Sequence, residues 1–224
     1  MQTIKALLPM KGNSERVPNK NIRNFAGEPL FFKVAHLLEN SEHVDEFFIN
    51  TDSDKIATLA QDNFKKVRII ERPKEICGDY VSMNEIIKHD LSQIDSDLFV
   101  QTHSTNPILS DYLFNKACEQ FLKSLDKYQS LFSVTRFQTR LYDHNKQPLN
   151  HNPEDLIRTQ DLPVMYEENS NLYFFTRESF KNANYKRIGK SFDLFEMDPK
   201  DAIDIDNEDD FLFAEEIFKL RNNK

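Results

Sequence analysis

The sequence has no tryptophan, only two cysteines and only four glycines among 224 residues. Cys77 and Cys118 do not have the spacing of a metal site, and two scattered thiols indicate a reducing compartment. There is also no apolar run of membrane-spanning length, and the N-terminus lacks the layout of a signal peptide. We therefore expect a cytoplasmic protein with no membrane partner.

The chain also has no excess of positive charge. The formal net charge is -8, which argues against nucleic acid or an anionic membrane as a partner. An anionic ligand would therefore have to be met by a local basic patch. With 39% hydrophobic residues, including nineteen phenylalanines, the chain is long enough to bury a substantial core. We take residues 1–224 as one domain.

Apolar runs alternate with helical patterns along most of the chain. Strands are predicted at 4–9, 47–51, 67–70, 98–101 and 130–135, and helices at 29–40, 53–61, 83–94 and 110–122. This alternation predicts an α/β fold, a Rossmann-like, doubly wound and mostly parallel sheet. The regular alternation of strands and helices ends after residue 136. Beyond it we predict strands at 172–176 and 192–197 and a final helix at 207–220. We interpret 137–190 as an excursion inserted in the same domain that serves as a dimerisation arm, and expect a homodimer.

A basic loop follows the first predicted strand. Gly12 permits a tight turn, Ser14 can hydrogen-bond phosphate oxygens, and Lys11, Arg16 and Lys20 can neutralise a polyphosphate. The spacing is neither that of a P-loop nor that of a dinucleotide fingerprint. The loop therefore predicts a triphosphate site at the end of a strand, the alternative being a solvated connection.

Two carboxylates stand close together near the C-terminus. If Asp204-Ile205-Asp206 forms a strand, Asp204 and Asp206 point to the same face and make a hard-oxygen site suited to Mg²⁺. Alternatively, Asp206 caps the last helix, with Asp209 as the acidic partner in its first turn.

A further polar cluster precedes the aromatic run at 172–176. Its Arg158 could grip a carboxylate in a bidentate fork, or could lie in an ordinary surface loop. Among the histidines, we place only His103 near a site, because it follows a predicted strand end.

Six short blocks in order resemble the acylneuraminate cytidylyltransferases, a family of CMP-sugar synthetases. The resemblance covers the chain almost end to end. The blocks are Pro9 to Asn21, Thr51-Asp52-Ser53, Arg72-Pro73-Lys74-Glu75-Ile76, Gln101 to Pro107, Gln160 to Asn169, and Asp204-Ile205-Asp206.

The resemblance implies an enzyme that couples CTP to a 2-keto-3-deoxy sugar acid and releases pyrophosphate. Lys11, Arg16 and Lys20 would then serve catalysis, and Asp204 and Asp206 would hold Mg²⁺ as the cofactor. The nucleotide would be bound by Ser14, Asn21 and Arg72, and the sugar by Gln101, Arg158 and Tyr173.

The chain departs from the family pattern near the expected sugar pocket. Ser170-Asn171 stands where Gly-Ala is usual, and the fourth block is one residue longer and carries His103. These differences favour a bacterial nonulosonic acid or an octulosonate over the commonest sialic acid. Two other functions stay open: a glycosyltransferase that uses Asp-x-Asp for a metal, and a nucleotide-binding protein without turnover.

Overall fold

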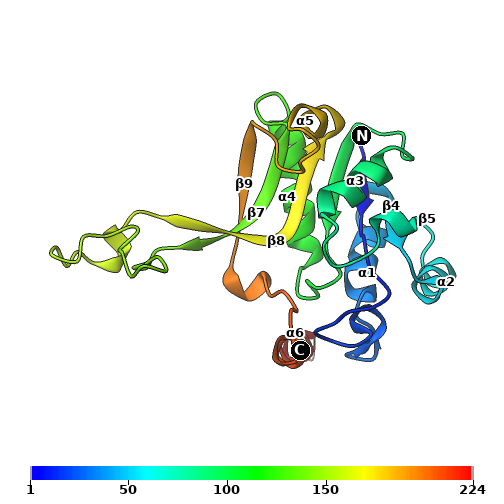
Figure 1. Ribbon diagram of the computed structural model, residues 1–224, viewed down its shortest axis with the longest axis horizontal. Helices are drawn as coiled ribbons and strands as arrows, with labels where there is room; N and C mark the ends of the chain where they lie inside the picture. The colour runs from blue at the N-terminus through cyan, green and yellow to red at the C-terminus, as the bar shows by residue number, and fades with distance from the viewer. Residues whose placement is uncertain (1, 223–224) are drawn as a thin grey trace.

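A computed structural model describes residues 2–222 of the chain. At its centre is a seven-stranded sheet with the strand order β5-β4-β1-β6-β8-β7-β9 (Figure 1). Its strands are β1 (Ile4–Leu7), β4 (Val44–Thr51), β5 (Val67–Glu71), β6 (Leu98–Thr102), β7 (Ser130–Phe137), β8 (Met165–Thr176) and β9 (Phe192–Met197). The α-helices are α1 (Phe32–Asn40), α2 (Asp54–Asn63), α3 (Met83–Leu91), α4 (Asp111–Ser124), α5 (Arg177–Asn182) and α6 (Glu208–Asn222).

The sheet is mostly parallel, as predicted. β1 runs parallel to β4 and β6, β4 runs parallel to β5, and β7 runs parallel to β9, whereas β8 is antiparallel to both β6 and β7. The chain builds outward from β1 to β4 and β5, then crosses to the other side of β1 to form β6. This reversal makes a topological switch point between β1 and β6, and ligands of open α/β sheets bind beyond the carboxyl ends of strands at such points.

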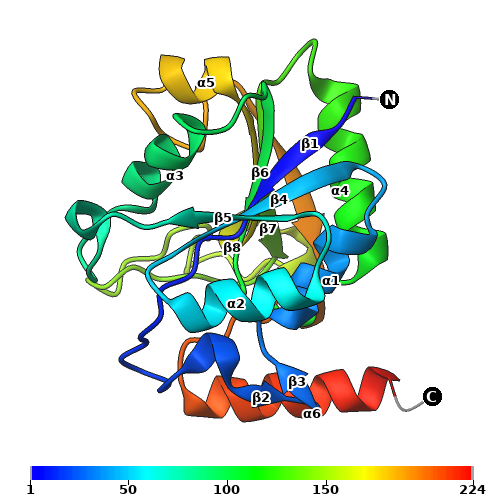
Figure 2. The same ribbon diagram turned by 90° about the vertical axis from the view of Figure 1, so that its right-hand side faces the viewer.

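The alternation of side chains in β1 divides the core between the two faces of the sheet. Ile4 and Ala6 pack in the larger cluster with residues of α1 and α4, whereas Leu7 joins Phe99 and Phe175 beneath α3 and α5. Figure 2 shows α3 and α5 on one side of the sheet and α1 and α4 on the other. Both faces of the sheet are therefore covered, as a doubly wound sheet requires.

A third, smaller layer joins the two ends of the chain. The hairpin of β2 (Asn24–Phe25) and β3 (Glu28–Pro29) packs on α6, and the rings of Phe25 and Phe211 meet edge to face at 5.5 Å. Arg23 pairs with Glu208, and its guanidinium lies 4.2 Å from the centre of the Phe211 ring. This layer holds the segment before α6 against the loop after β1.

The excursion between β7 and β8 leaves the body of the molecule. These two strands continue beyond the sheet, and residues 138–164 project from it as an extended arm (Figure 1). The remaining part of 137–190 forms β8, α5 and the loop to β9.

The helices agree with the sequence prediction apart from three differences. α3 ends at Leu91 instead of residue 94, because Ser92 and Gln93 form a turn. α1 begins at Phe32 instead of residue 29 because Glu28 and Pro29 pair with β2. The six-residue α5 was not predicted, since it is too short to show periodicity. None of the helices in the described residues is both long and apolar enough to cross a membrane.

Candidate active site

A cavity of ≈ 390 Å³ lies at the carboxyl ends of β1 and β6, at the switch point of the sheet. It is lined by six of the residues predicted to bind a nucleotide or to act in catalysis: Lys11, Ser14, Arg16, Lys20, Asn21 and Arg72. His103, Ser104 and Thr105 line it from the end of β6. Residues far apart in the sequence are thus gathered at one edge, because parallel strands end at the same edge.

The loop after β1 is held close to the end of β4. The backbone N–H of Gly12 donates to Asp52 Oδ1 at 2.6 Å, and a Cβ at Gly12 would lie only 2.8 Å from Ser53 Cβ. Asn21 fixes the other end of the loop: its amide donates to the Lys11 carbonyl at 2.9 Å and accepts from the Ser104 hydroxyl at 2.7 Å. Gly12 is therefore required for close packing.

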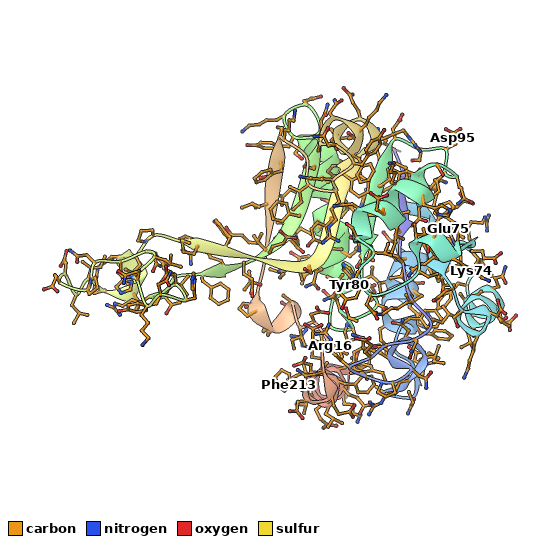
Figure 3. All side chains as sticks on the ribbon, viewed as in Figure 1. Arg16, Lys74, Glu75, Tyr80, Asp95 and Phe213 are labelled. Atoms are coloured by element: carbon orange, nitrogen blue, oxygen red, sulfur yellow. The ribbon has the colours of Figure 1, made fainter. Side chains whose placement is uncertain are left out.

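The three cations of the loop each contact an oxygen of another segment. Lys11 pairs with Asp79, and Arg16 pairs with Asp206 Oδ1 at 2.7 Å. Lys20 donates to the Ile205 carbonyl at 2.6 Å. Figure 3 shows the side chain of Arg16 next to α6. Burial lowers the pKa of Lys20, while the nearby carboxylates Asp204 and Asp206 oppose that shift. Arg16 and Lys20 thus face the segment before α6, whereas Lys11 faces the loop before α3.

One carboxylate oxygen of Asp204, Oδ1, is buried without a hydrogen-bond partner in the part of the chain that the structure describes. Burial raises the pKa of Asp204 and the neighbouring Asp206 adds to that shift, whereas a hydrogen bond with Thr105 and the charge of Lys20 oppose it. No cluster of three or more histidine, cysteine or acidic side chains occurs in residues 2–222. Two carboxylates nevertheless suit Mg²⁺, which takes one or two from the protein and the rest from phosphates and water.

The predicted strand at 204–206 is wrong. These residues have no regular secondary structure, because the Ile205 N–H makes a single bond to the Thr105 carbonyl at 3.0 Å and Ile205 is buried against α6. The predicted helix cap is wrong as well. Asn207 caps α6, since its side chain accepts from Asp210 N–H at 3.0 Å and Asp210 Oδ2 accepts from Asn207 N–H at 2.9 Å. The Asp206 side chain is thereby left to pair with Arg16.

A buried polar chain supports Arg72 from behind the cavity. Arg72 donates through Nε to Asn50 Oδ1 at 2.6 Å and through a terminal nitrogen to the Asn50 carbonyl at 2.9 Å. The Asn50 amide in turn donates to Asp90 Oδ1 at 2.5 Å. Burial raises the pKa of Asp90 to about 6, against the opposing effects of Asn50, His89 and Arg72. Burial also lowers the pKa of Arg72.

Gln101 and Tyr173 lie directly opposite each other on β6 and β8. Both are almost completely buried, at 0% and 1% exposure. The Tyr173 hydroxyl donates to Glu168, and burial raises its pKa to about 12. Ser170 adopts a left-handed φ of 58°, a conformation that glycine tolerates best.

Arg158 does not join this group within one copy of the chain. It lies in the projecting arm (Figure 1). There its guanidinium pairs with Asp161 at 2.7 Å, and its side chain is 73% exposed. The cluster of Arg158 with Tyr173 that the sequence suggested is therefore not formed in one copy.

Several residues of the site were missed by the sequence reasoning. Asp79, Asn50 and Asp90 follow no recognisable motif, and only long-range packing brings them to Lys11 and Arg72. Arg187, in the loop between α5 and β9, lies over the Tyr173 ring at 3.4 Å from its centre.

Comparison with known sequences assigns the chain to a family. The sequence model of a family described as "Cytidylyltransferase" matches residues 5–223. The chain belongs to this family. It is 25% identical to the pseudaminic acid cytidylyltransferase of Campylobacter jejuni, with 96% of each chain covered. It is 30% identical to N-acylneuraminate cytidylyltransferase B of Danio rerio over 94% of this chain, and it spans 50% of the length of that relative. The cytidylyltransferase family and the nucleotidyltransferase class predicted from the sequence are thus confirmed.

Solved structures of low sequence identity share the fold. A CMP:2-keto-3-deoxy-manno-octonic acid synthetase in complex with CTP aligns with a TM-score of 0.72 at 10% identity, covering 99% of this chain and 100% of that one. A 4-diphosphocytidyl-2C-methyl-D-erythritol synthase from Anaerococcus prevotii aligns with a TM-score of 0.66 at 13% identity, covering 97% and 96% of the two chains.

Proposed function

We propose that this cytidylyltransferase couples CTP to a 2-keto-3-deoxy sugar acid of the nonulosonic type and releases pyrophosphate. The observation that carries the proposal is the cavity at the switch point, which Lys11, Arg16, Lys20 and Arg72 line. Asp204 and Asp206 lie beside Arg16 and Lys20. The names of the relatives, which act on pseudaminic acid or N-acylneuraminate, support the class of sugar.

In the proposed reaction, the anomeric hydroxyl of the sugar acid attacks the α-phosphorus of CTP. A bond forms between the anomeric oxygen and the α-phosphorus, and the bond from that phosphorus to the oxygen bridging to the β-phosphate breaks. Pyrophosphate leaves, and the hydroxyl proton passes to solvent. Lys11, Arg16 and Lys20 stabilise the negative charge of the triphosphate and of the departing pyrophosphate. Ser14 donates a further hydrogen bond to phosphate, and Asn21 and Arg72 bind the cytidine.

Asp204 and Asp206 are the residues that would hold Mg²⁺. The buried and unpartnered Oδ1 of Asp204 fits a cation, and the exposed ion pair of Asp206 with Arg16 can be exchanged. Bound magnesium would neutralise phosphate charge and polarise the α-phosphate.

The projecting arm supports a homodimer as the active form. The arm exposes Tyr142, Leu149 and Leu156, which a second copy of the chain would cover. In such a dimer, Arg158 would reach the sugar site of the partner. Sedimentation analysis tests this assembly, and a monomer that is fully active at every protein concentration would contradict it.

Pyrophosphate release tests the proposed reaction. The protein is incubated with each of the four nucleoside triphosphates, Mg²⁺ and a panel of sugar acids that includes pseudaminic acid, N-acetylneuraminic acid and a 3-deoxy-octulosonate. We expect release with CTP and one class of sugar acid only. Release from CTP that needs no sugar acid, or transfer from a preformed nucleotide sugar to an acceptor, would contradict the proposal.

A further inference from the structure

The guanidinium of Arg187 covers two residues that were expected to bind the sugar. It stacks on Tyr173 and donates a hydrogen bond to Gln101 Oε1. Gln101 and Tyr173 have almost no exposed surface, whereas 18% of the Arg187 side chain is exposed. A ligand that approaches this place therefore meets Arg187 before either of the other two.

Arg187 retains unused hydrogen-bond donors although it is half-buried. Within residues 2–222, its guanidinium makes one hydrogen bond, to Gln101, and one loose ion pair with Glu168 Oε1 at 3.9 Å. The same Glu168 oxygen already accepts from the Tyr173 hydroxyl. Burial lowers the pKa of Arg187, because desolvation disfavours the charged form. A carboxylate ligand would supply the close counter-ion that this cation lacks.

Arg177 shows what a purely structural arginine looks like in this fold. Its three guanidinium nitrogens all donate to backbone carbonyls, those of Leu91, Ile94 and Ser96. Arg177 thereby ties α3 and the loop before β6 to α5. Arg187 makes no comparable set of backbone contacts among the described residues, which favours a ligand-binding role.

His103 connects Arg187 with the nucleotide cavity. Its side chain lines that cavity, and its Nε2 lies 3.0 Å from the Gln101 amide nitrogen. Burial and the positive charges of Arg187 and Lys20 lower the pKa of His103 to about 3. The neutral imidazole of His103 thus lies near two cations, Arg187 beside Gln101 and Lys20 in the loop after β1.

We propose that Arg187 binds the carboxylate of the sugar acid from within the same subunit, and that Gln101 and Tyr173 are positioning residues that orient its guanidinium. The proposal rests on the function proposed above. The planar guanidinium can grip a carboxylate with two parallel hydrogen bonds. In a cyclised 2-keto acid, the carboxyl carbon is bonded to the anomeric carbon. Anchoring the carboxylate therefore fixes the hydroxyl that attacks the α-phosphorus.

The test compares Arg187→Gln with Lys186→Gln, which removes the same charge from the exposed neighbouring residue. Pyrophosphate release is measured at saturating CTP and Mg²⁺ against the concentration of the sugar acid that the wild-type protein uses. A hydrogen bond to a charged group contributes about 1.5–3 kcal/mol, so we expect KM for the sugar acid to rise about 10- to 150-fold in Arg187→Gln. KM for CTP should change less than about twofold, and Lys186→Gln should resemble the wild type.

A second measurement uses the carboxamide of the same sugar, which cannot form the charged pair. The wild-type protein should prefer the acid by about tenfold or more, and Arg187→Gln should lose that preference. Arg187→Lys should recover part of it, because lysine keeps the charge but not the planar fork. Thermal unfolding of each variant checks that it is folded.

The possible outcomes separate this inference from the proposed function. If the wild-type protein releases pyrophosphate but Arg187→Gln keeps both its KM and its preference for the acid, the inference is overturned and the function stands. If the wild-type protein releases no pyrophosphate with CTP and any sugar acid of the panel, the function fails, and the inference fails with it.

Discussion

The buried carboxyl group of Asp90 should make the stability of this protein depend on pH in a way that one substitution removes. Asp90 is 0% exposed, and its Oδ2 has no hydrogen-bond partner among the described residues. Its Oδ1 accepts from Asn50, which in turn accepts from Arg72. Because desolvation outweighs these favourable contacts, the pKa of Asp90 rises from 3.8 to about 6 on folding.

The sign and size of the effect follow from linkage. Since the folded-state pKa lies above the unfolded value, the stabilising contribution is complete below the unfolded pKa and is lost as pH rises through about 6. The whole shift corresponds to roughly 3 kcal/mol, of which about 2 kcal/mol falls between about pH 4.5 and 7.5. Asp90→Asn removes the titration but keeps an acceptor for Asn50. As pH rises over that range, the unfolding free energy of Asp90→Asn should therefore increase by about 2 kcal/mol relative to that of the wild type.

Urea denaturation of both proteins at several pH values measures this difference directly, because the titration of all other groups cancels to first order. Asp62→Asn, which alters an exposed carboxylate on α2, is the control for the chemical change itself. A difference between Asp90→Asn and wild type that stays constant from about pH 4.5 to 7.5 would refute the reasoning. It would mean that Asp90 ionises in the folded protein as it does in the unfolded chain.

Three further predictions concern the loop and the acidic segment of the site. Asp204→Asn should slow pyrophosphate release by about 100-fold or more. It should not lower the melting temperature, since the buried carboxylate costs stability. If pyrophosphate release depended on the Mg²⁺ concentration in the same way in both proteins, the metal role would be contradicted. Gly12→Ala should lower the free energy of unfolding in urea by about 1–3 kcal/mol and raise KM for CTP, because its Cβ would lie 2.8 Å from Ser53 Cβ. Asn13→Ala, at the exposed neighbouring position, should change neither quantity. Arg16→Ala should weaken the dependence of CTP affinity on Mg²⁺, measured by calorimetric titration, because Asp206 would no longer be paired with Arg16 before the ligands bind. If Mg²⁺ changed CTP affinity by the same factor in both proteins, this prediction would be refuted.

Much of the fold could be read from the sequence because its helices and strands are of ordinary length and strongly patterned. The strand at Val67–Glu71 and the helix at Asp111–Ser124 lie within one or two residues of their predicted bounds. The segment 204–206 shows where a local pattern fails. Its alternation suits a strand, yet Ile205 is buried between α6 and the β2–β3 hairpin, and no neighbouring strand provides a ladder of hydrogen bonds. A strand needs a partner that local alternation does not reveal.

The nucleotide half of the candidate site was easier to predict than the sugar half. Lys11, Ser14 and Arg16 come from one loop after one strand, so a short stretch of sequence contains most of the information. Arg187 could not be found in this way, because its contacts with Gln101 and Tyr173 depend on the antiparallel pairing of β6 with β8. That pairing joins residues far apart in the chain, and no spacing rule for a single segment encodes it.

The charges of the site also explain how an acidic protein can keep a cluster of cations ready for a triphosphate. The loop after β1 would repel itself if its cations stood alone, but Lys11 and Arg16 are paired with Asp79 and Asp206. These pairs are largely exposed, and such pairs contribute only about 0–1 kcal/mol each. Phosphate oxygens can therefore replace the carboxylates at little cost. When Arg16 turns to a phosphate, Asp206 is released beside Asp204, so the binding of the nucleotide itself would free the second carboxylate for the metal.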